Sequence, residues 1–266
     1  MSQLPATPAK IQLRHVTHLY VTPTQVFTAL KGINLQVEEG AFICLVGPSG
    51  CGKTTLLSLI AGLEKPTAGQ VLIDGEQLTG PTHKVGYMLQ QDYLFNWRTI
   101  QDNVYLGLEI QQIRNKENEQ YALHLLEEMG LADYRLAYPY QLSGGMRQRV
   151  ALARTLACDP EILLLDEPFS ALDYQTKLKL EDLVVAMLRR YQNKTAILVT
   201  HDLSEAVAMG DRLYIMERNP GQIRAEVPIP HHIRTALPFQ ARHQEGFNEL
   251  FERVWMEMER DADAAD

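Results

Sequence analysis

The feature that most constrains the fold of this 266-residue chain is the stretch GPSGCGKTT at positions 47–55. It lies between an apolar run at 42–46 and an apolar run with helical spacing at 56–61. A strand that enters a helix through a glycine-rich turn is the arrangement in which the pattern G-x-x-x-x-G-K-[S/T] binds phosphate. The stretch therefore predicts an α/β fold with a phosphate-binding loop at its centre.

The residue types in this stretch suit the phosphates of a nucleotide. Glycine adopts positive φ angles, so successive backbone N–H groups can converge on one anion, and the next helix start adds donors and partial positive charge. Lys53 is expected to reach the β- and γ-phosphates, Thr54 to hold Mg²⁺ and Thr55 to donate to the α-phosphate. The alternative is a glycine-rich turn with an accidental lysine. The predicted nucleotide-binding residues are Gly47, Pro48, Ser49, Gly50, Cys51, Gly52, Lys53, Thr54 and Thr55.

Composition and charge argue against several classes of protein. The net charge of −8 and the pI near 5.5 weigh against a nucleic-acid partner, which would favour a basic face. No run of eighteen apolar residues is present, so the chain is not expected to span a bilayer by itself, and its first ten residues lack the pattern of a secretory signal. Three widely spaced cysteines fit a reducing cytoplasm better than a disulfide framework or a zinc site.

The rest of the chain alternates predicted strands with predicted helices. Helical spacing predicts a helical insertion over about 91–158 and a final amphipathic helix over 247–258, and the Asp74-Gly75 turn predicts a hairpin. Strands that alternate with helices imply a mainly parallel sheet. The predicted strands are 11–20, 28–37, 70–73, 84–89, 162–165, 195–200 and 212–216, the last being the final strand, and further helices are predicted at 146–157 and 174–191.

Ionisable side chains follow two of the predicted buried strands. Asp166 and Glu167 come after the apolar run at 162–165, and His201 follows the strand at 195–200. Ligands of open α/β sheets bind beyond the carboxyl ends of the strands, where the phosphate loop also begins. Asp166 is expected to hold Mg²⁺, Glu167 to orient the attacking water and His201 to bind the γ-phosphate. The alternatives are a solvated strand end and a structural histidine.

The sequence Ser143-Gly144-Gly145 forms a second glycine-rich helix start that can donate N–H groups to an anion. It lies in the predicted insertion, far along the chain from Gly47. In a head-to-tail homodimer, the Ser143 turn of one copy would face the Gly47 loop of the other across a shared ATP, and two-fold symmetry would supply two identical sites. The alternative is an ordinary helix cap.

Five ordered segments, GPSGCGKTT, LSGGMRQRV, ILLLDEP, SALD and THD, resemble the motifs of ABC transporter ATPase subunits over about 11–228. The resemblance implies a P-loop NTPase fold: a RecA-like core with a mainly parallel sheet, an antiparallel β subdomain and a helical signature subdomain at about 91–158. A C-terminal helical tail over 229–266 would follow. It also implies ATP and Mg²⁺ as cofactors, ATP hydrolysis coupled to transport, transmembrane permease subunits as partners and a peripheral position on the cytoplasmic face of the inner membrane.

The resemblance assigns roles to further residues by their place in the motifs. Gln90 matches the glutamine that contacts metal and water and links the site to the membrane subunit, and Asp173 matches the aspartate that crosses the dimer interface. Ser143 and Gly145 match residues that touch the partner's γ-phosphate. Tyr20 matches the aromatic residue that stacks on adenine; Phe27 is its rival for that role, and packing of the Tyr20 ring on the sheet is the other interpretation.

Three segments, LFNWRTIQDNV, GMRQRV and RNPGQIRAEVPIP, resemble the nitrate/sulfonate/taurine uptake subfamily, although Asn96 stands where that subfamily typically has proline. This implies an importer of a small anionic or nitrogen- or sulfur-containing solute that works with a solute-binding protein. Another importer class, such as a vitamin-precursor or amino-acid system, a soluble ABC ATPase of DNA repair or translation, and a nucleotide-binding regulator are the alternatives. The interval from Gln90 to Leu142 is too short for the coiled coil of the repair proteins, and the translation proteins carry two ATPase units.

Two further expectations concern reactivity and docking. Cys51, inside the phosphate loop, is expected to react with a bulky thiol reagent that blocks nucleotide binding, and prior ATP is expected to protect it. Tyr93, Leu94, Phe95 and Trp97 form an apolar cluster in a predicted loop. Exposed aromatic residues in a loop predict a docking surface for another protein, with core packing as the alternative.

Overall fold

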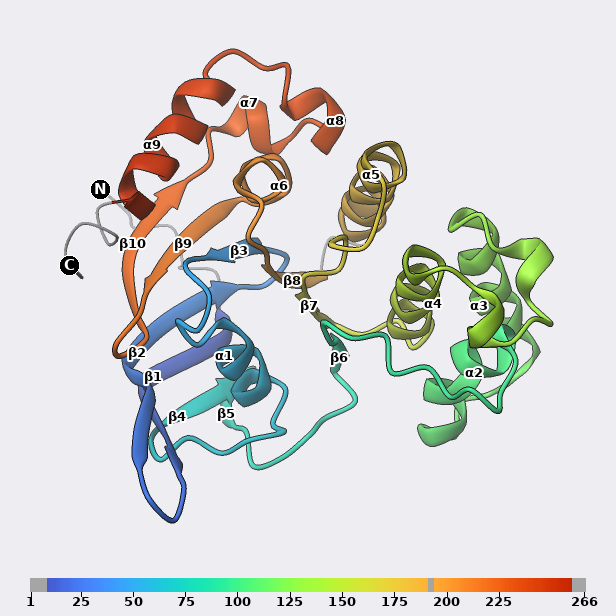
Figure 1. Ribbon diagram of the computed structural model, residues 1–266, viewed down its shortest axis with the longest axis horizontal. Coiled ribbons are helices and arrows are strands. Elements are labelled where there is room, and N and C mark those ends of the chain that lie inside the picture. The colour runs from blue at the N-terminus through green and yellow to red at the C-terminus, as the bar shows by residue number, and fades with distance from the viewer. Residues whose placement is uncertain (1–8, 191–193, 260–266) are drawn as a thin grey trace, which may run out of the picture. The chain divides into compact units, whose positions relative to one another are not determined.

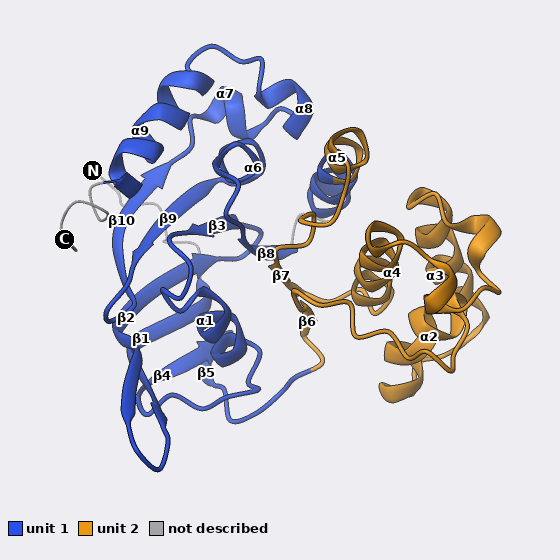
Figure 2. Ribbon diagram, in the orientation of Figure 1, with its two compact units in different colours: residues 1–82, 181–266 blue, residues 83–180 orange. Residues whose placement is uncertain are grey.

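The computed structural model describes residues 9–190 and 194–259 (Figure 1). The chain divides into two compact units, one formed by residues 1–82 and 181–266 and the other by residues 83–180 (Figure 2). The first unit holds an antiparallel sheet and a mainly parallel group of strands, and the second holds a parallel strand pair and a group of helices. Helix α5 (Tyr174–Arg190) begins in the second unit and ends in the first.

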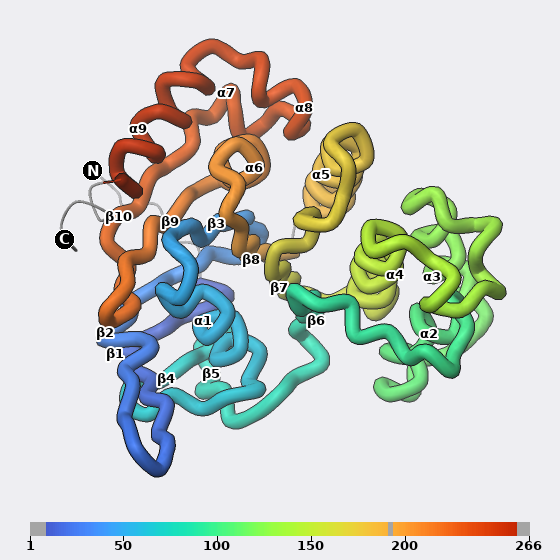
Figure 3. Tube along the Cα trace, viewed as in Figure 1, coloured from blue at the N-terminus to red at the C-terminus, as the bar shows by residue number. Residues whose placement is uncertain are grey.

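The antiparallel sheet of the first unit has the strand order β2-β1-β4-β5. Strands β1 (Ala9–Val21) and β2 (Val26–Glu38) form a long hairpin, drawn in blue in Figure 3. Strands β4 (Ala68–Ile73) and β5 (Glu76–Gln77) confirm the hairpin predicted at the Asp74-Gly75 turn. Both turn residues have positive φ, which is the geometry that favours Asp-Gly in a two-residue hairpin loop.

The parallel strands of the first unit carry the phosphate loop. Strand β3 (Phe42–Val46) lies between β8 (Thr195–Val199) and β9 (Arg212–Glu217), and is parallel to both. Every residue of β3 and β8 is buried, which explains their unbroken apolar sequences.

The prediction that the strand at 212–216 is the last one is wrong, because β10 (Gln222–Pro228) pairs antiparallel with β9. Only Val227 of β10 is fully buried. An edge strand that buries so little has a weak alternation of apolar and polar residues, so its sequence pattern did not identify it.

In the described part of the first unit, five helices besides the end of α5 accompany these strands. Helix α1 (Lys53–Ile60) follows β3, α6 (Leu203–Met209) follows β8, and the short α7 (His231–Arg234) and α8 (Pro238–Ala241) precede α9 (Phe247–Glu259). Helix α6 contacts β3, α8 and α9. Helix α9 buries one stripe of apolar side chains at helical spacing, so the predicted final amphipathic helix is confirmed. The buried residues of α9 are Phe247, Leu250 and Val254.

The second unit contains the parallel pair β6 (Val85–Met88) and β7 (Ile162–Asp166). Between them the chain forms α2 (Ile100–Ile110), α3 (Lys116–Glu128), α4 (Gly144–Leu156) and the 3₁₀ turns η1 (Ala132–Tyr134) and η2 (Pro139–Gln141). The segment 91–158, which the structure describes in full, therefore contains helices and no strand. Helix α4 packs against α2, α3 and β6.

Candidate functional site

The predicted phosphate loop leaves the buried strand β3 and enters α1. Gly50 and Gly52 have φ angles of 79° and 95°, values that glycine adopts without steric cost. A Cβ atom at Gly47 would collide with the carbonyl oxygen of Met216, so this position requires glycine for space. Among the described residues no side chain caps α1 and its first turn contains no acidic residue. The N–H groups of this turn can therefore serve an external anion.

Backbone carbonyl groups of the phosphate loop hold the Lys53 side chain. Its Nζ donates to the carbonyl oxygens of Gly47 at 2.8 Å and Pro48 at 3.1 Å, and the residue is only 9% exposed. These hydrogen bonds compensate for the burial of the ammonium charge. Thr54 is exposed on the first turn of α1, where its hydroxyl group is available to a ligand. The arrangement suits a bound polyphosphate.

The expectation that the Cys51 thiol is accessible is wrong. Cys51 is fully buried, and its Sγ lies 3.6 Å from Lys53 Nζ. Burial raises the pKa of this thiol, against the opposing influence of the Lys53 charge. The sulfur atom packs close to Gly47, where an added Cβ atom would lie 3.0 Å from it, so the side chain lies in the interior.

Tyr20 lies beside the phosphate loop. Its hydroxyl group is 3.2 Å from Thr55 Oγ1 and donates to the Glu64 carboxylate at 3.0 Å. The His18 ring meets Tyr20 edge-on at 4.8 Å. Burial raises the pKa of Tyr20, so the phenol remains a donor at neutral pH. Its rival Phe27 stands opposite Tyr20 in the β1–β2 hairpin and is 52% exposed.

His201 and the phosphate loop leave the same edge of the first unit's parallel strands. Leu45 of β3 is paired with Val199 of β8, so the two strands end side by side. His201 is exposed two residues beyond β8, and Asp202 caps α6 by accepting from the backbone N–H of Glu205 at 3.1 Å. The position of His201 is thus fixed between a buried strand and a capped helix.

The second unit brings together Gln90 and Glu167. Met88 of β6 is paired with Leu165 of β7. Gln90 lies two residues after the end of β6, and Glu167 lies one residue after the end of β7. Gln90 Nε2 donates to Glu167 Oε2 at 3.1 Å. Asp166, the last residue of β7, is 2% exposed. Glu167 has a φ angle of 50°, a value that is uncommon for residues other than glycine.

Ser143 caps α4, as its predicted position at a helix start requires. Its Oγ accepts from the Met146 N–H at 3.3 Å, and the helix begins at Gly144, two residues before the predicted start. A Cβ atom at Gly145 would lie 2.9 Å from the carbonyl oxygen of Ala171, so the helix start approaches the segment after β7 closely. Ser143 and Gly144 are exposed.

Asp173 lies exposed at the start of α5. Its Oδ1 accepts from the Thr176 N–H at 3.0 Å, and this hydrogen bond lowers the pKa of the Asp173 carboxyl group. The side chain is therefore ionised at neutral pH, and it presents a negative charge at the surface of the second unit.

Each unit thus assembles one set of predicted residues. The first unit links Tyr20 to Thr55 of the phosphate loop and places His201 beyond the strand next to the one that carries the loop, and the second unit groups Gln90 with Glu167. Two contacts were not predicted, because the sequence gives no local signal for them. Glu64 holds the Tyr20 hydroxyl group, and Gln148 donates to the backbone carbonyl of Glu167 at 3.0 Å.

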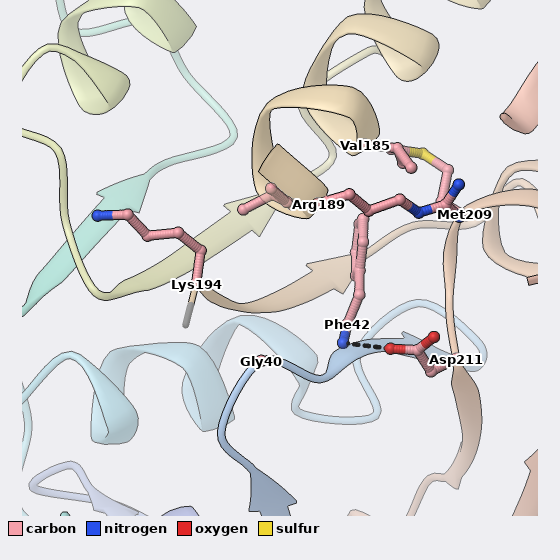
Figure 4. A pocket seen from close by; sticks show the side chains of 8 residues that line it. Gly40, Phe42, Val185, Arg189, Lys194, Met209 and Asp211 are labelled. Carbon is pink, nitrogen blue, oxygen red and sulfur yellow. Dashed lines mark hydrogen bonds between the residues drawn. The ribbon is translucent and has the colours of Figure 1, made fainter. Parts of the chain in front are cut away.

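Of two pockets, one is lined by predicted site residues and the other is not. A pocket of about 430 Å³ in the second unit is lined by Gln90, Gly144 and Gln148, among others. A smaller pocket of about 230 Å³ in the first unit contains Phe42 and Asp211, whose carboxylate accepts from the Phe42 N–H at 2.8 Å (Figure 4). The smaller pocket lies at the amino ends of β3 and β9, opposite to the edge where ligands of α/β sheets bind, and we do not assign it to catalysis.

The predicted apolar cluster after β6 is only partly exposed. Tyr93 and Trp97 are 58% and 74% exposed, and the Trp97 ring stacks on Phe95 at 4.8 Å. Leu94 is buried in the core. No helix within residues 9–190 and 194–259 has the length and hydropathy needed to cross a membrane.

Comparison with known proteins identifies the family. Residues 30–170 match the family described as ABC transporter. YtlC of Bacillus subtilis (strain 168), whose name is "Uncharacterized ABC transporter ATP-binding protein", is 52% identical over 93% of this chain and 95% of its own. The nitrate import ATP-binding protein NrtD of Synechocystis sp. (strain ATCC 27184 / PCC 6803 / Kazusa) is 43% identical over 82% of each chain. The taurine import ATP-binding protein TauB of Roseobacter denitrificans (strain ATCC 33942 / OCh 114) is 42% identical over 76% of this chain and 75% of its own.

A solved structure shows the same fold. The ATP-binding cassette MJ0796, determined as a dimer in a post-hydrolysis state with ADP and Pi, superimposes with a TM-score of 0.76 at 34% identity. The match covers 83% of this chain and 99% of MJ0796. The predicted P-loop NTPase fold is therefore confirmed. The chain belongs to the ABC transporter family, as an ATP-binding cassette with ATPase activity.

Proposed function

We propose that this ATPase energises an importer of a small anionic or nitrogen- or sulfur-containing solute. Relatives named for nitrate and taurine import support the solute class. The observation that carries the ATPase part of this proposal is the phosphate loop. There α1 starts without a side-chain cap, and the buried Lys53 donates to the loop carbonyl of Gly47. In this proposal residues 11–228 form the ATPase domain, with a helical insertion at about 91–158, and residues 229–266 form a C-terminal helical tail.

The first unit would bind the nucleotide. Backbone N–H groups of the loop and Lys53 would hold the phosphates, and Thr55 would add a donor to the α-phosphate. Tyr20 would stack on the adenine ring. Its contact with Thr55 supports this role, because the aromatic ring and the phosphate loop are linked by one hydrogen bond.

The predicted magnesium ligands suit the chemistry of that ion. Thr54, Gln90 and Asp166 offer hydroxyl, amide and carboxylate oxygens, which are the hard donors that Mg²⁺ prefers. Asp166 is a buried carboxylate, whose charge a cation would offset. Within the described ranges no group of three or more His, Cys, Asp or Glu forms a cage. Mg²⁺ bound through one carboxylate together with substrate phosphates does not need one, and when bound it offsets phosphate charge.

Glu167 would orient the attacking water and accept its proton, while Gln90 holds the carboxylate and His201 binds the γ-phosphate. The Gln90–Glu167 hydrogen bond supports this assignment, because it holds the Glu167 carboxylate in one orientation, as a group that orients the attacking water requires. Lys53 would stabilise negative charge on the transferring phosphoryl group.

The second half of each site would come from another copy. Ser143, Gly144 and Gly145 of one molecule would contact the γ-phosphate bound by its partner in a head-to-tail homodimer, with Asp173 at the interface. The similar cassette MJ0796 is described as a dimer with ADP and Pi, which supports the dimeric part of this proposal. Tyr93 and Trp97 would contact permease subunits on the cytoplasmic face of the inner membrane, and a solute-binding protein would deliver the solute.

Glu167→Gln tests the function directly. We expect about 100-fold or greater loss of turnover, because the amide cannot accept the proton, with ATP binding retained. Phosphate release and binding of a fluorescent ATP analogue provide the measurements, and Glu127→Gln on the exposed face of α3 is the matched control. Tagged Glu167→Gln protein, purified from host membranes with ATP, is expected to retain the permease. Wild-type turnover in this variant would contradict the assignment.

A further inference from the structure

Helix α4 contacts both chain segments that carry the Gln90–Glu167 hydrogen bond. On one side its residue Gln148 contacts the segment that follows β7, and on the other its residue Arg154 contacts the segment that follows β6. All of these residues belong to the second unit. Ser143, which caps the start of this helix, contacts the nucleotide of a partner copy in the proposed function.

Gln148 fixes the backbone of Glu167. Its Nε2 donates to the carbonyl oxygen of Glu167 at 3.0 Å and to Ser170 Oγ at 3.2 Å, and its Oε1 accepts from the Ala171 N–H at 2.9 Å. Gln148 is 5% exposed. Ser170 Oγ donates to the same carbonyl oxygen at 3.0 Å. A residue at positive φ, as Glu167 is, persists only where its surroundings hold the backbone, and these contacts do so.

Arg154 fixes the other segment in a comparable way. Its guanidinium donates to the carbonyl oxygens of Asp92 at 2.6 Å and Tyr93 at 2.9 Å, and thus bridges two successive peptide groups. Burial lowers the pKa of Arg154, although arginine remains charged at any physiological pH. Arg147, two helical turns earlier on the same face, donates to Asp92 Oδ2 at 3.0 Å.

We propose that α4 sets the geometry between Gln90 and Glu167, and that Gln148 and Arg154 are positioning residues for hydrolysis. Neither needs to touch ATP. Gln148 holds the backbone of Glu167, which would orient the attacking water, and Arg154 holds the segment that follows Gln90, a proposed magnesium ligand. Because the same helix starts at the Ser143 turn, a contact made there is linked to the Glu167 carboxylate through one rigid element. This inference rests on the proposed role of Glu167.

The test removes the contacts of Gln148 and preserves its volume. Gln148→Leu is expected to lower kcat by about 10-fold to 100-fold, with the KM for ATP within about 2-fold of the wild type, because loss of a buried hydrogen bond misaligns Glu167 but leaves the phosphate loop intact. Thr155→Val is the matched control. Thr155 is also buried on α4, but its hydroxyl group donates only to Ala151 of the same helix, so its kcat is expected to stay unchanged.

Arg154→Lys provides a second variant that keeps the charge. An ammonium group cannot bridge two carbonyl oxygens as a guanidinium does, so a several-fold lower kcat with unchanged KM is expected. If Gln148→Leu does not fold, as judged by its midpoint of unfolding in urea, the kcat and KM of Arg154→Lys decide whether α4 has the positioning role. Combining Gln148→Leu with Glu167→Gln should produce no further loss, since a positioning residue acts only through the group it positions.

The outcomes separate this inference from the function it rests on. The positioning role is supported if Gln148→Leu lowers kcat, Thr155→Val does not, and Gln148→Leu causes no further loss in the Glu167→Gln background. Three results would overturn the positioning role while Glu167→Gln remains inactive. They are a wild-type kcat in Gln148→Leu, a rise in its KM as large as the fall in its kcat, and an additive loss of kcat in the double variant. If Glu167→Gln itself retains turnover, the catalytic assignment and the positioning role both fail.

Discussion

The Cys51 side chain lies inside the phosphate loop with no exposed surface. Two effects act on its thiol: burial raises the pKa, and the Lys53 ammonium opposes that rise but is the smaller influence. Cys44 in β3 is also buried, with a pKa raised well above the ordinary value by burial. Thiols react as thiolates, so protonated and buried cysteines are inert.

We therefore expect one slowly reacting thiol in the native protein. Cys158 is only partly buried, although burial raises its pKa too. A maleimide carrying a polyethylene glycol chain, counted by gel shift, should modify Cys158 alone in buffer and all 3 cysteines in urea. Cys158→Ser should abolish the native reaction. Fast modification of Cys51 that ATP prevents would show that the thiol faces the ligand instead.

At the scale of elements, the C-terminal segment is fastened to α5 and α6 within the first unit. Arg189, near the end of α5, donates to the carbonyl oxygens of Thr235 and Ala236 at 2.9 and 3.0 Å, just after α7. Arg242 forms a 2.7 Å ion pair with Glu181 of α5 and donates to Ser204 of α6. Glu181 is completely buried, so this ion pair lies in the interior rather than on the surface.

Removing Arg242 should destabilise this part of the fold. Arg242→Leu leaves the buried Glu181 carboxylate without that guanidinium, and we expect a loss of about 3 kcal/mol in the free energy of unfolding, measured in urea. Arg253→Leu on the exposed side of α9 is the matched control and should change little. Replacing both partners by leucine should recover much of the loss, since no buried charge remains. An unchanged midpoint in Arg242→Leu would show that the pair does not anchor the segment.

At the scale of the whole molecule, the predicted site residues fall into two sets. The phosphate loop belongs to the first unit, and the Ser143 turn belongs to the second, at the exposed start of α4. Our proposal of a head-to-tail dimer gives the Ser143 turn a ligand, namely the γ-phosphate held by the partner. Its N–H groups suit that ligand because α4, like α1, has no acidic residue in its first turn among the described residues.

Charge at the Ser143 turn should therefore control dimerisation. Glu167→Gln with ATP is expected to form a species of twice the 30.1 kDa chain mass, measured by light scattering. Adding Ser143→Asp should keep the protein monomeric with ATP bound, because aspartate still caps α4 but repels phosphate. Asn115→Asp, at the equivalent cap of α3, is the matched control and should not prevent the dimer. ATP-dependent dimers of the Ser143→Asp variant would exclude a head-to-tail contact at this turn.

Much of this protein could be predicted from local sequence pattern. The glycine spacing of the phosphate loop, the unbroken apolar runs of β3 and β8, the Asp74-Gly75 turn and the stripe on α9 each specify their own conformation through steric limits or through periodicity. These features depend on residues that are neighbours in the chain. They were sufficient to identify the fold class and to list the residues of the predicted nucleotide site.

Only the tertiary structure decided which of these residues meet. Gln90 and Glu167 are separated by 77 positions and Tyr20 and Glu64 by 44, and each pair comes together because distant segments lie side by side. The burial of Cys51 and the edge strand β10 depend in the same way on packing rather than on local pattern. A hydrogen-bond partner is chosen by distance in space, and periodicity along the chain does not record that distance.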